Sequence, residues 1–264
     1  MKVLKKGSTG QEVIYLQQLL QNKGYDIFDN GVFGDGTYEK IIQFQKDCKL
    51  VADGIVDEKT WNALIDSNSP YYTLTHKDYL ECASILGVDV ATIKAIQEVE
   101  TGSVGGFLYP NKPTILFEGH IFWNELKKKG KNPENYVKGN EDILYPKWTK
   151  QFYKGKNGEW DRLEKAMQID KISAISAASW GAFQIMGFNY KVCNCYSVEE
   201  FVEEMSKNLK SQLKLFIYFI KNNKLDSYLK MKDWAGLAKK YNGPAYAENK
   251  YDVKLHQAYE KWSR

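Results

Sequence analysis

The chain has 264 residues, of which 43% are hydrophobic and 14% aromatic, so it can bury a substantial core and is not a disordered protein. Its net charge is +4, because residues 1–70 carry 8 Lys and 10 Asp or Glu, whereas the remainder carries 29 Lys or Arg and 23 Asp or Glu. The basic part suits a polyanionic surface, but without a dense Arg cluster it does not favour nucleic acid as a partner.

The hydropathy of the chain argues against membrane insertion. The first residues, Met-Lys-Val-Leu-Lys-Lys-Gly, lack the apolar run of a signal peptide, and no later stretch reaches membrane-spanning length. We therefore expect synthesis in the cytoplasm and no integral membrane segment.

The four cysteines are not spaced as a disulfide framework or as a metal site. Cys193 and Cys195 are too close in sequence for ordinary mutual pairing, and no C-x-x-C motif or nearby His suggests metal ligands. The sequence therefore predicts reduced thiols, no metal and no cofactor.

Residues 1–66 contain a short internal repeat. The segment Asn30–Tyr38 recurs 23 positions later as Asp53–Trp61. Each copy has a turn glycine, an apolar pair, a Thr that we interpret as a helix N-cap, and an aromatic residue at a helix start. Because helical apolar spacing also covers Gln11–Gln21, the pattern predicts a bundle of three short helices. Nothing in it suggests chemistry, so we interpret it as a binding module.

A polar, Pro-containing stretch follows, and we interpret residues 67–75 as a linker. The pattern Thr75-x-x-Asp78 predicts a helix that ends at Gly87, and Asp89 is a suitable N-cap for the next helix.

The rest of the chain is dominated by helical periodicity. Later amphipathic stretches lie at Glu159–Gln168, Ser197–Asn222 and Met231–Tyr241. Strand-like alternation is scarce and is centred on Lys112–Phe117. Residues 76–264 are therefore predicted to form a second, mainly α domain, and the whole chain belongs to the all-α class.

Glu100 ends one of these helices on its apolar side. At 100° per residue it falls about 20° from Ile93, whereas Glu98 points roughly 140° away from Ile93. A carboxyl on the core face must be paired or have its pKa raised by desolvation. A raised pKa suits a general acid at neutral pH, although a last-turn Glu that reaches solvent is the alternative interpretation.

Three further segments carry polar groups in unusual surroundings. Glu118 and His120 follow the apolar run Ile115–Phe117, and Gln184 lies among small residues. A turn rich in rings and amides holds Tyr241, Asn242 and Tyr246. With Glu100 they supply an acid in apolar surroundings, a second carboxylate, an amide and several rings, which are the groups needed for glycosidic bond cleavage.

The pattern of turn glycines, helix starts and apolar positions in the first 66 residues supports a resemblance. Its motifs are Gly7-x-x-Gly10-x-x-Val13-x-x-Leu16-Gln17, Gly24-Tyr25, Asn30-Gly-Val-Phe-Gly34, Thr37, Phe44-Gln45, Leu50, Asp53-Gly-Ile-Val-Asp57 and Thr60-Trp61-x-x-Leu64. The segment resembles the three-helix peptidoglycan-binding module of many cell-wall hydrolases. The resemblance implies bacterial peptidoglycan as the partner.

A second set of motifs covers residues 75–262. It comprises Glu100-Thr-Gly, Ile115-Leu-Phe-Glu118-x-His120, Ser179-Trp-Gly-x-Phe-Gln184-Ile-Met-Gly-Phe-Asn189, Asp233-Trp-Ala and Tyr241-Asn-Gly-Pro-x-Tyr246. This order resembles the superfamily of goose-type lysozymes and lytic transglycosylases, and more fully the N-acetylmuramidase family of phage endolysins. Thr101 and Gly119 depart from the Glu-Ser-Gly and Glu-Arg-His of many members, and the second change removes a possible charge partner of Glu118.

The resemblance implies roles for the predicted site residues. Glu100 would protonate the glycosidic oxygen, and Glu118 would stabilise oxocarbenium charge or orient the attacking water; a structural acid held by His120 is the alternative. Gln184 would bind substrate or satisfy loop groups. Tyr241 and Asn242 are expected to hold the glycan, and Tyr246 either holds the glycan or belongs to the core.

Three functions remain open at this point. A muramidase would hydrolyse the β-1,4 bond between N-acetylmuramic acid and N-acetylglucosamine, whereas a lytic transglycosylase would form 1,6-anhydro ends without a second carboxylate. A non-catalytic wall-binding protein is the third alternative. Glu118 and the fuller resemblance favour the muramidase. We expect a monomeric phage-type endolysin that reaches the wall after the membrane is breached, and a bacterial autolysin exported by an unusual route is the alternative.

Overall fold

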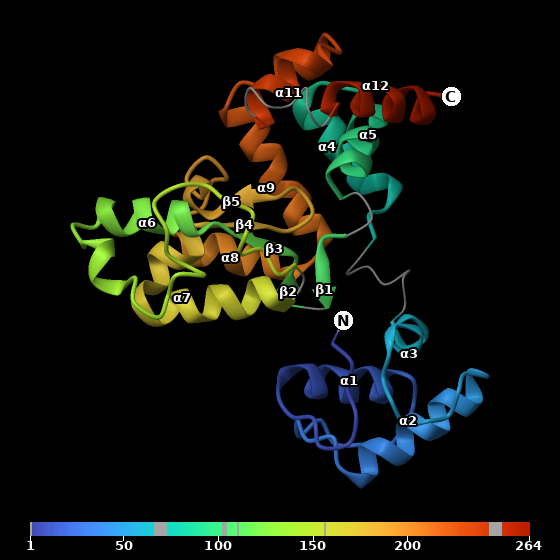
Figure 1. The fold of residues 1–264 in the computed structure, drawn as a ribbon. Coiled ribbons are helices and arrows are strands. Elements are labelled where there is room, and N and C mark those ends of the chain that lie inside the picture. The colour runs from blue at the N-terminus through green and yellow to red at the C-terminus, as the bar shows by residue number, and fades with distance from the viewer. Residues whose placement is uncertain (1, 66–72, 102–104, 110, 156, 243–249) are drawn as a thin grey trace. The chain divides into compact units, whose positions relative to one another are not determined.

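The structure is a computed structural model that describes residues 2–65, 73–101, 105–109, 111–155, 157–242 and 250–264. It divides the chain into two compact units, Met1–Ser69 and Pro70–Arg264 (Figure 1). The division falls between residues 67 and 75, the predicted linker, most of which lies outside the described residues. Each unit is described below by itself.

The amino-terminal unit contains three helices, α1 (Gln11–Asn22), α2 (Asp35–Asp47) and α3 (Glu58–Leu64). Their apolar faces share a core with the segments that precede α1, α2 and α3. The core side chains are Leu4, Val13, Leu16, Leu20, Phe33, Ile41, Phe44, Val56, Trp61 and Leu64, each at most 3% exposed. The predicted three-helix bundle is therefore confirmed.

The sequence repeat is also a structural repeat, because each half holds a buried glutamine with the same four hydrogen bonds. The Gln17 amide donates to Asn30 Oδ1 (3.1 Å), Val32 O (3.0 Å) and Thr37 Oγ1 (2.9 Å) and accepts from Gly31 N (2.9 Å). The Gln45 amide donates to Asp53 Oδ1 (3.1 Å), Ile55 O (2.9 Å) and Thr60 Oγ1 (3.2 Å) and accepts from Gly54 N (2.9 Å). Gly31 and Gly54 adopt positive φ angles of 73° and 72°, as the turns require.

The predicted Thr N-caps of this unit are wrong. The caps are Gly34 for α2 and Asp57 for α3, so Thr37 and Thr60 lie within the first helical turns. Both threonines are buried, and their hydroxyl groups accept from the repeat glutamines. A buried amide needs partners, and this need outweighs the local preference of Thr for a cap.

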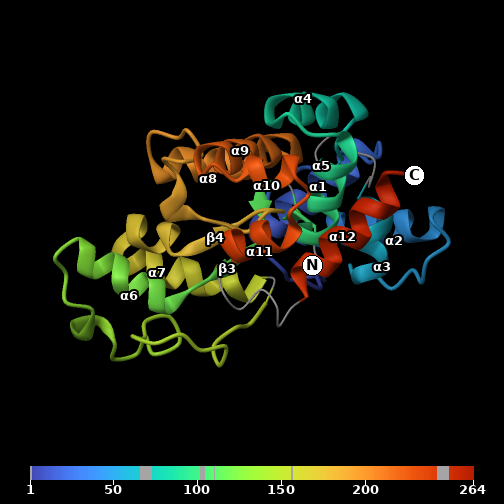
Figure 2. The same ribbon diagram turned by 90° about the horizontal axis from the view of Figure 1, so that it is seen from above.

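The carboxyl-terminal unit is mainly helical. Its helices are α4 (His76–Leu86), α5 (Val90–Thr101), α6 (Gly119–Lys128), α7 (Asn157–Ser176), α8 (Val198–Lys207), α9 (Leu209–Asn222), α10 (Asp226–Lys230), α11 (Trp234–Asn242) and α12 (Tyr251–Trp262). Helices α5 and α12 lie side by side, and α6 and α7 lie at the opposite end of this unit from α4 and α5 (Figures 1 and 2). Within the described residues, no helix has the length and apolar character needed to cross a membrane.

Local signals in the sequence set several helix ends. A reciprocal capping box between Thr75 and Asp78 starts α4, and Gly87 ends it at φ 68°. Asp89 Oδ1 accepts from the Thr92 N–H at 2.7 Å and so caps the start of α5. These three predictions are confirmed. The predicted stretch at 197–222 is instead two helices, because Asn208 adopts an extended backbone conformation (φ −170°, ψ 173°) between α8 and α9.

Two small sheets support the functional region. Strands β1 (Phe107–Tyr109) and β2 (Lys112–Pro113) pair antiparallel. Strands β3 (Ile115–Phe117), β4 (Ala178–Trp180) and β5 (Ile185–Met186) form an antiparallel sheet in that order. Glu118 directly follows β3 and Gln184 directly precedes β5, so the sheet joins two segments that are far apart in the sequence.

Candidate active site

Glu100 lies in the last turn of α5, on the face that packs into the core. Ile93 and Ile96 of the same face are each 1% exposed. The Glu100 Oε1 atom is buried and has no hydrogen-bond partner among the described residues. Burial raises the pKa of this carboxyl to about 8, as the sequence pattern predicted.

Glu98 shows the opposite environment on the same helix. Its Oε2 accepts from Lys261 Nζ at 2.9 Å and from Trp262 Nε1 at 2.7 Å. Both donors belong to the last turn of α12. This ion pair lowers the pKa of Glu98. Two carboxyl groups two residues apart are therefore driven toward opposite protonation states at neutral pH.

A cavity of about 130 Å³ adjoins Glu100. It is lined by residues of α5, the β4–β5 turn, β5, the following turn, α9 and α11, namely Glu100, Phe183, Gln184, Ile185, Met186, Asn189, Phe219 and Tyr241. The structure thus brings together three of the predicted site residues, Glu100, Gln184 and Tyr241. Phe183, Ile185 and Phe219 are apolar residues of this lining, and burial of the Glu100 carboxyl leaves it poorly solvated.

Tyr241 is anchored across this cavity. Its hydroxyl donates to the Phe183 carbonyl at 2.6 Å, and its ring contacts Phe216 and Phe219 edge to face at centroid distances of 6.1 and 5.7 Å. Burial and the nearby Glu100 charge raise the pKa of Tyr241 well above its usual value. The hydroxyl is therefore a neutral group that fixes the position of the Phe183 backbone.

The side-chain amide of Gln184 forms hydrogen bonds with groups in and near its own turn. Its Nε2 donates to Gly181 O at 2.8 Å and Thr114 O at 3.4 Å, and its Oε1 accepts from Ser179 Oγ at 2.8 Å. Its backbone lies in the left-handed region at φ 46°, which is unfavourable for a residue with a side chain and is often retained at functional sites. The amide thus satisfies loop groups, one of its two predicted roles, and also borders the cavity.

Two predicted glycan-binding residues cannot be placed in the site. Tyr246 lies outside the described residues, and so does the side chain of Asn242, the last residue of α11. Their predicted contacts with substrate remain predictions.

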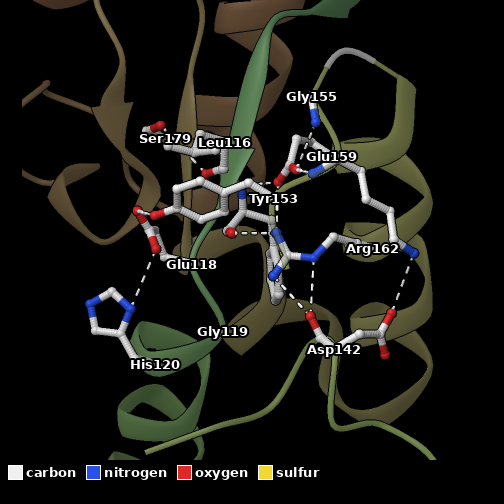
Figure 3. A network of polar contacts seen from close by, with 12 residues as sticks. Leu116, Glu118, Gly119, His120, Asp142, Tyr153, Gly155, Glu159, Arg162 and Ser179 are labelled. Atoms are coloured by element: carbon white, nitrogen blue, oxygen red, sulfur yellow. Dashed lines mark hydrogen bonds and ion pairs between the residues drawn. The ribbon is translucent and has the colours of Figure 1, made fainter. Parts of the chain in front are cut away.

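Glu118 is not among the described residues that line the Glu100 cavity; it belongs to the polar network in Figure 3. Tyr153 donates to Glu118 Oε1 at 2.7 Å, and His120 Nδ1 lies 3.4 Å from Glu118 Oε2. Neither of the last two atoms has a hydrogen-bond partner among the described residues. Glu118 is therefore held by Tyr153, and the His120 contact that the sequence suggested is loose.

The charges around Glu118 act in both directions. Burial raises the pKa of Glu118, while the Tyr153 hydrogen bond and the positive charge of Arg162 partly offset this shift. Burial lowers the pKa of His120, so its imidazole is neutral at neutral pH and does not form an ion pair with Glu118 there. The ion-pair partner of Arg162 is Glu159, whose negative charge raises the pKa of Glu118 and so opposes the effect of Arg162.

A buried ion pair holds the end of β3 in place. Arg162 Nη1 donates to Glu159 Oε2 at 2.8 Å and to Phe117 O at 2.9 Å, and the two side chains are 0% and 1% exposed. Glu159 Oε2 also accepts from Phe117 N at 3.1 Å. Figure 3 shows this pair beside Glu118, so it positions the backbone from which the Glu118 side chain projects.

Sequence reasoning missed several residues of this region. Phe183, Met186 and Asn189 lie within the quoted motif around Gln184 and could have been found by their position in it. Tyr153 and Phe219 carry no local signal. Gln212 was also missed; it is 0% exposed and bonds three backbone groups, Gly106 O (3.1 Å), Ala182 N (2.8 Å) and Met205 O (2.8 Å).

Small residues around Gln212 permit this arrangement. A Cβ at Gly181 would lie 2.7 Å from the Gln212 amide, and one at Gly106 would lie 2.5 Å from its Oε1. Gly181 also adopts a positive φ of 70°. These two glycines therefore allow a buried glutamine to tie the β4–β5 turn to α9.

The cysteines and the potential metal ligands were predicted to form neither a disulfide framework nor a metal site. All four cysteines are free thiols, as predicted, and three of them are buried. Within the described residues, no cluster of three or more His, Cys, Asp or Glu side chains has an arrangement suited to a metal ion.

Comparison with known proteins agrees with this geometry. Residues 89–263 match the family model described as N-acetylmuramidase, and residues 9–64 match the model of the putative peptidoglycan binding domain. Among solved structures, the chain is similar to the Burkholderia AP3 phage endolysin, with 38% identity, complete coverage of both chains and a TM-score of 0.69.

Two spore cortex-lytic enzymes are also similar to parts of the chain. The Bacillus cereus enzyme is 29% identical over 113 residues, which are 42% of this chain and 37% of that enzyme. The Bacillus subtilis (strain 168) enzyme is 41% identical over 73 residues, which are 27% of this chain and 24% of that enzyme. The chain thus spans 37% of the length of the first of these curated relatives and 24% of the second.

Proposed function

This chain belongs to the N-acetylmuramidase family of glycosidases, and from that premise we propose that it is a peptidoglycan hydrolase of the endolysin type. Its substrate is the β-1,4 bond between N-acetylmuramic acid and N-acetylglucosamine, and Glu100 is the general acid. The amino-terminal unit binds the same polymer, and the protein works as a monomer.

The environment of Glu100 is the observation that carries this proposal. A carboxyl with a pKa of about 8 is mostly protonated at neutral pH and can deliver its proton to the glycosidic oxygen as the C–O bond breaks. Oε1 has no hydrogen-bond partner among the described residues, so none of these residues competes with substrate for this atom. The adjoining cavity provides space for a sugar substituent next to the acid.

The other site residues are assigned supporting roles. Glu118 supplies the second carboxylate, which stabilises oxocarbenium charge or orients the attacking water. Its place after β3 supports this role, because the same sheet carries β5, whose residues line the Glu100 cavity. Gln184 and Tyr241 shape the subsite next to Glu100, and Asn242 and Tyr246 contact the glycan from the end of α11 and the segment after it.

A lytic transglycosylase is the second candidate, and one observation favours it. Glu100 is the one carboxyl among the described residues that line the cavity. In a transglycosylase the 6-hydroxyl of the muramic acid residue attacks its own C1, so no second carboxylate has to activate water. The same general acid serves both reactions.

Analysis of the released fragments tests both candidates. Purified walls are digested with the protein and with its Glu100→Gln variant, and the soluble fragments are identified by mass spectrometry. Reducing muramic acid ends are expected from the parent protein, and none from the variant. Anhydro ends would establish the transglycosylase, and reducing glucosamine ends or cleavage by Glu100→Gln would contradict the proposed bond or the proposed acid.

The biological setting follows from the same reaction. We infer that the protein acts on the wall once the membrane is breached, which is how a phage-type endolysin releases progeny. The similarity to a phage endolysin over the whole chain supports this setting. The basic character of the larger unit also suits the anionic bacterial wall.

A further inference from the structure

The amino-terminal unit carries a cleft of about 240 Å³ over its first repeat. Residues between α1 and α2 and the first turns of α2 form it. Its lining includes Asp26, Phe28, Gly34, Gly36 and Lys40. The proposed reaction uses none of these residues.

Comparison of the two repeats shows how this cleft is opened. Gly34 and Gly36 occupy the positions that Asp57 and Lys59 hold in the second repeat. A Cβ built on either glycine meets no other atom within 4 Å, so both glycines border open space. Asp57 instead caps α3 by accepting from the Thr60 N–H at 2.9 Å, whereas α2 has no side-chain cap.

Phe28 provides an apolar contact surface at this cleft. Its side chain is 83% exposed, although a phenyl ring in water is unfavourable. Its counterpart in the second repeat is Val51, which is also exposed (78%) but is smaller and not aromatic. A bound ligand that covers the Phe28 ring would recover the hydrophobic free energy that the free protein forgoes.

The charges of the cleft indicate what kind of ligand fits it. Asp26 and Lys40 both line it, and neither has an ion-pair partner among the described residues. The N-acetylated sugars of a glycan strand carry no net charge to match this pair. A stem peptide carries charges of both signs. It has a terminal carboxylate and, in strands that are not cross-linked, the ammonium group of its diamino acid.

From this arrangement we infer that the cleft of the first repeat binds the stem peptide of peptidoglycan. Lys40 faces the peptide carboxylate, Asp26 faces the ammonium group, and the Phe28 ring covers the alanine methyl groups. This inference rests on the wall binding proposed above and names the part of the polymer that is recognised.

The first test closes the cleft with the residue that the second repeat uses. Gly34 (φ −88°, ψ −166°) and Asp57 (φ −87°, ψ −173°) share one backbone conformation, so Gly34→Asp fits without strain and can cap α2. The added carboxylate would repel that of the peptide. In a full chain that also carries Glu100→Gln, which keeps walls intact, we expect sedimentation with purified walls to weaken about tenfold or more, while the melting temperature stays equal or rises.

A second pair of variants separates ligand contact from folding. Phe28→Ala removes an exposed ring and is expected to weaken wall binding about fivefold, since truncated interface aromatics commonly have effects of this size. Val51→Ala at the matching position of the second repeat is the control and should bind like the parent. Equal binding by the Phe28→Ala, Gly34→Asp and parent proteins would overturn the inference.

Competition identifies the part of the polymer that is bound. A soluble stem tetrapeptide with a free diamino acid should displace the Glu100→Gln protein from walls, whereas oligomers of N-acetylglucosamine should not. Displacement by the sugar oligomers alone would overturn the stem-peptide assignment and leave wall binding in place. If the Glu100→Gln protein did not sediment with walls at all, the proposed binding function would fail, and the inference with it.

Discussion

Glu100 and Glu118 are two largely buried carboxyl groups of one unit that differ in the polar groups around them. The Glu100 Oε1 atom has no hydrogen-bond partner among the described residues, and burial raises its pKa to about 8. Glu118 receives a hydrogen bond from Tyr153 and lies near Arg162, and these contacts limit its pKa rise. Isolation keeps an acid protonated, whereas a supporting network keeps a carboxylate available, so the difference supports the proposal that Glu100 is the proton donor.

The largest expected effect follows from removing the acid itself. Glu100→Gln should lower kcat on purified walls by about 10³-fold, because the amide keeps the shape of the side chain but has no proton to donate. Glu98→Gln on the same helix is the matched control, and its exposed ion pair with Lys261 predicts near-parent activity. Equal losses in both variants would show damage to α5 in place of a lost acid.

Removing Arg162 tests the polar network around Glu118, the second carboxyl of the comparison. Arg162→Ala leaves Glu159 buried without its partner, so the free energy of unfolding should fall by about 3–5 kcal/mol. The control is Lys165→Ala, whose partly exposed pair with Asp142 should contribute less than about 1 kcal/mol. Urea unfolding measures both, and similar losses would contradict the structural role of the buried pair.

The raised pKa of Glu100 makes stability depend on pH in a defined direction. The folded protein holds the Glu100 proton up to about pH 8, whereas an unfolded chain releases it near the ordinary glutamate pKa of 4.5. The contribution is thus fully present below pH 4.5 and is lost as pH rises through 8. Compared with the parent, Glu100→Gln should gain stability as pH rises between these limits, by about 5 kcal/mol at pH 9, where Glu100 is ionised in both the folded and the unfolded chain.

Denaturant unfolding of both proteins at pH 4.5, 7 and 9 provides the measurement. The ionisation of Glu100 should also be visible in catalysis: kcat/KM on walls should fall above about pH 8 as this acid loses its proton. A stability difference that does not change with pH would mean that Glu100 is not isolated in the folded protein.

The smallest expected effects concern Glu118 and the residue that holds it. Glu118→Gln should lower kcat about tenfold to hundredfold as the second carboxylate is lost, with KM nearly unchanged. Tyr153→Phe removes the hydrogen bond that lowers the pKa of Glu118, so the acid limb of the pH–rate profile should move to higher pH. Tyr196→Phe, a change at a residue that is 95% exposed, is the control. A normal rate in Glu118→Gln would remove Glu118 from the reaction and favour the transglycosylase.

Local sequence patterns were sufficient for the helices and for the orientation of Glu100. The Thr75–Asp78 capping box, the stop at Gly87 and the apolar face of α5 all depend on residues within a few turns of one another. The repeat was recognisable for the same reason, since a turn glycine leaves a signature in the sequence. The Thr caps failed because a buried glutamine from a different helix takes their hydroxyl groups.

Local sequence patterns could not predict contacts between residues that are far apart in the sequence. Tyr153 reaches Glu118 across 35 positions, and Gln212 reaches Gly106 across 106. The burial of a glutamate on the core face and the type of each unit could thus be determined from the sequence alone, because periodicity and turn chemistry are local. Only the tertiary structure decided which carboxyl stays alone and which acquires partners, since a pKa is set by the groups that folding brings within a few ångströms.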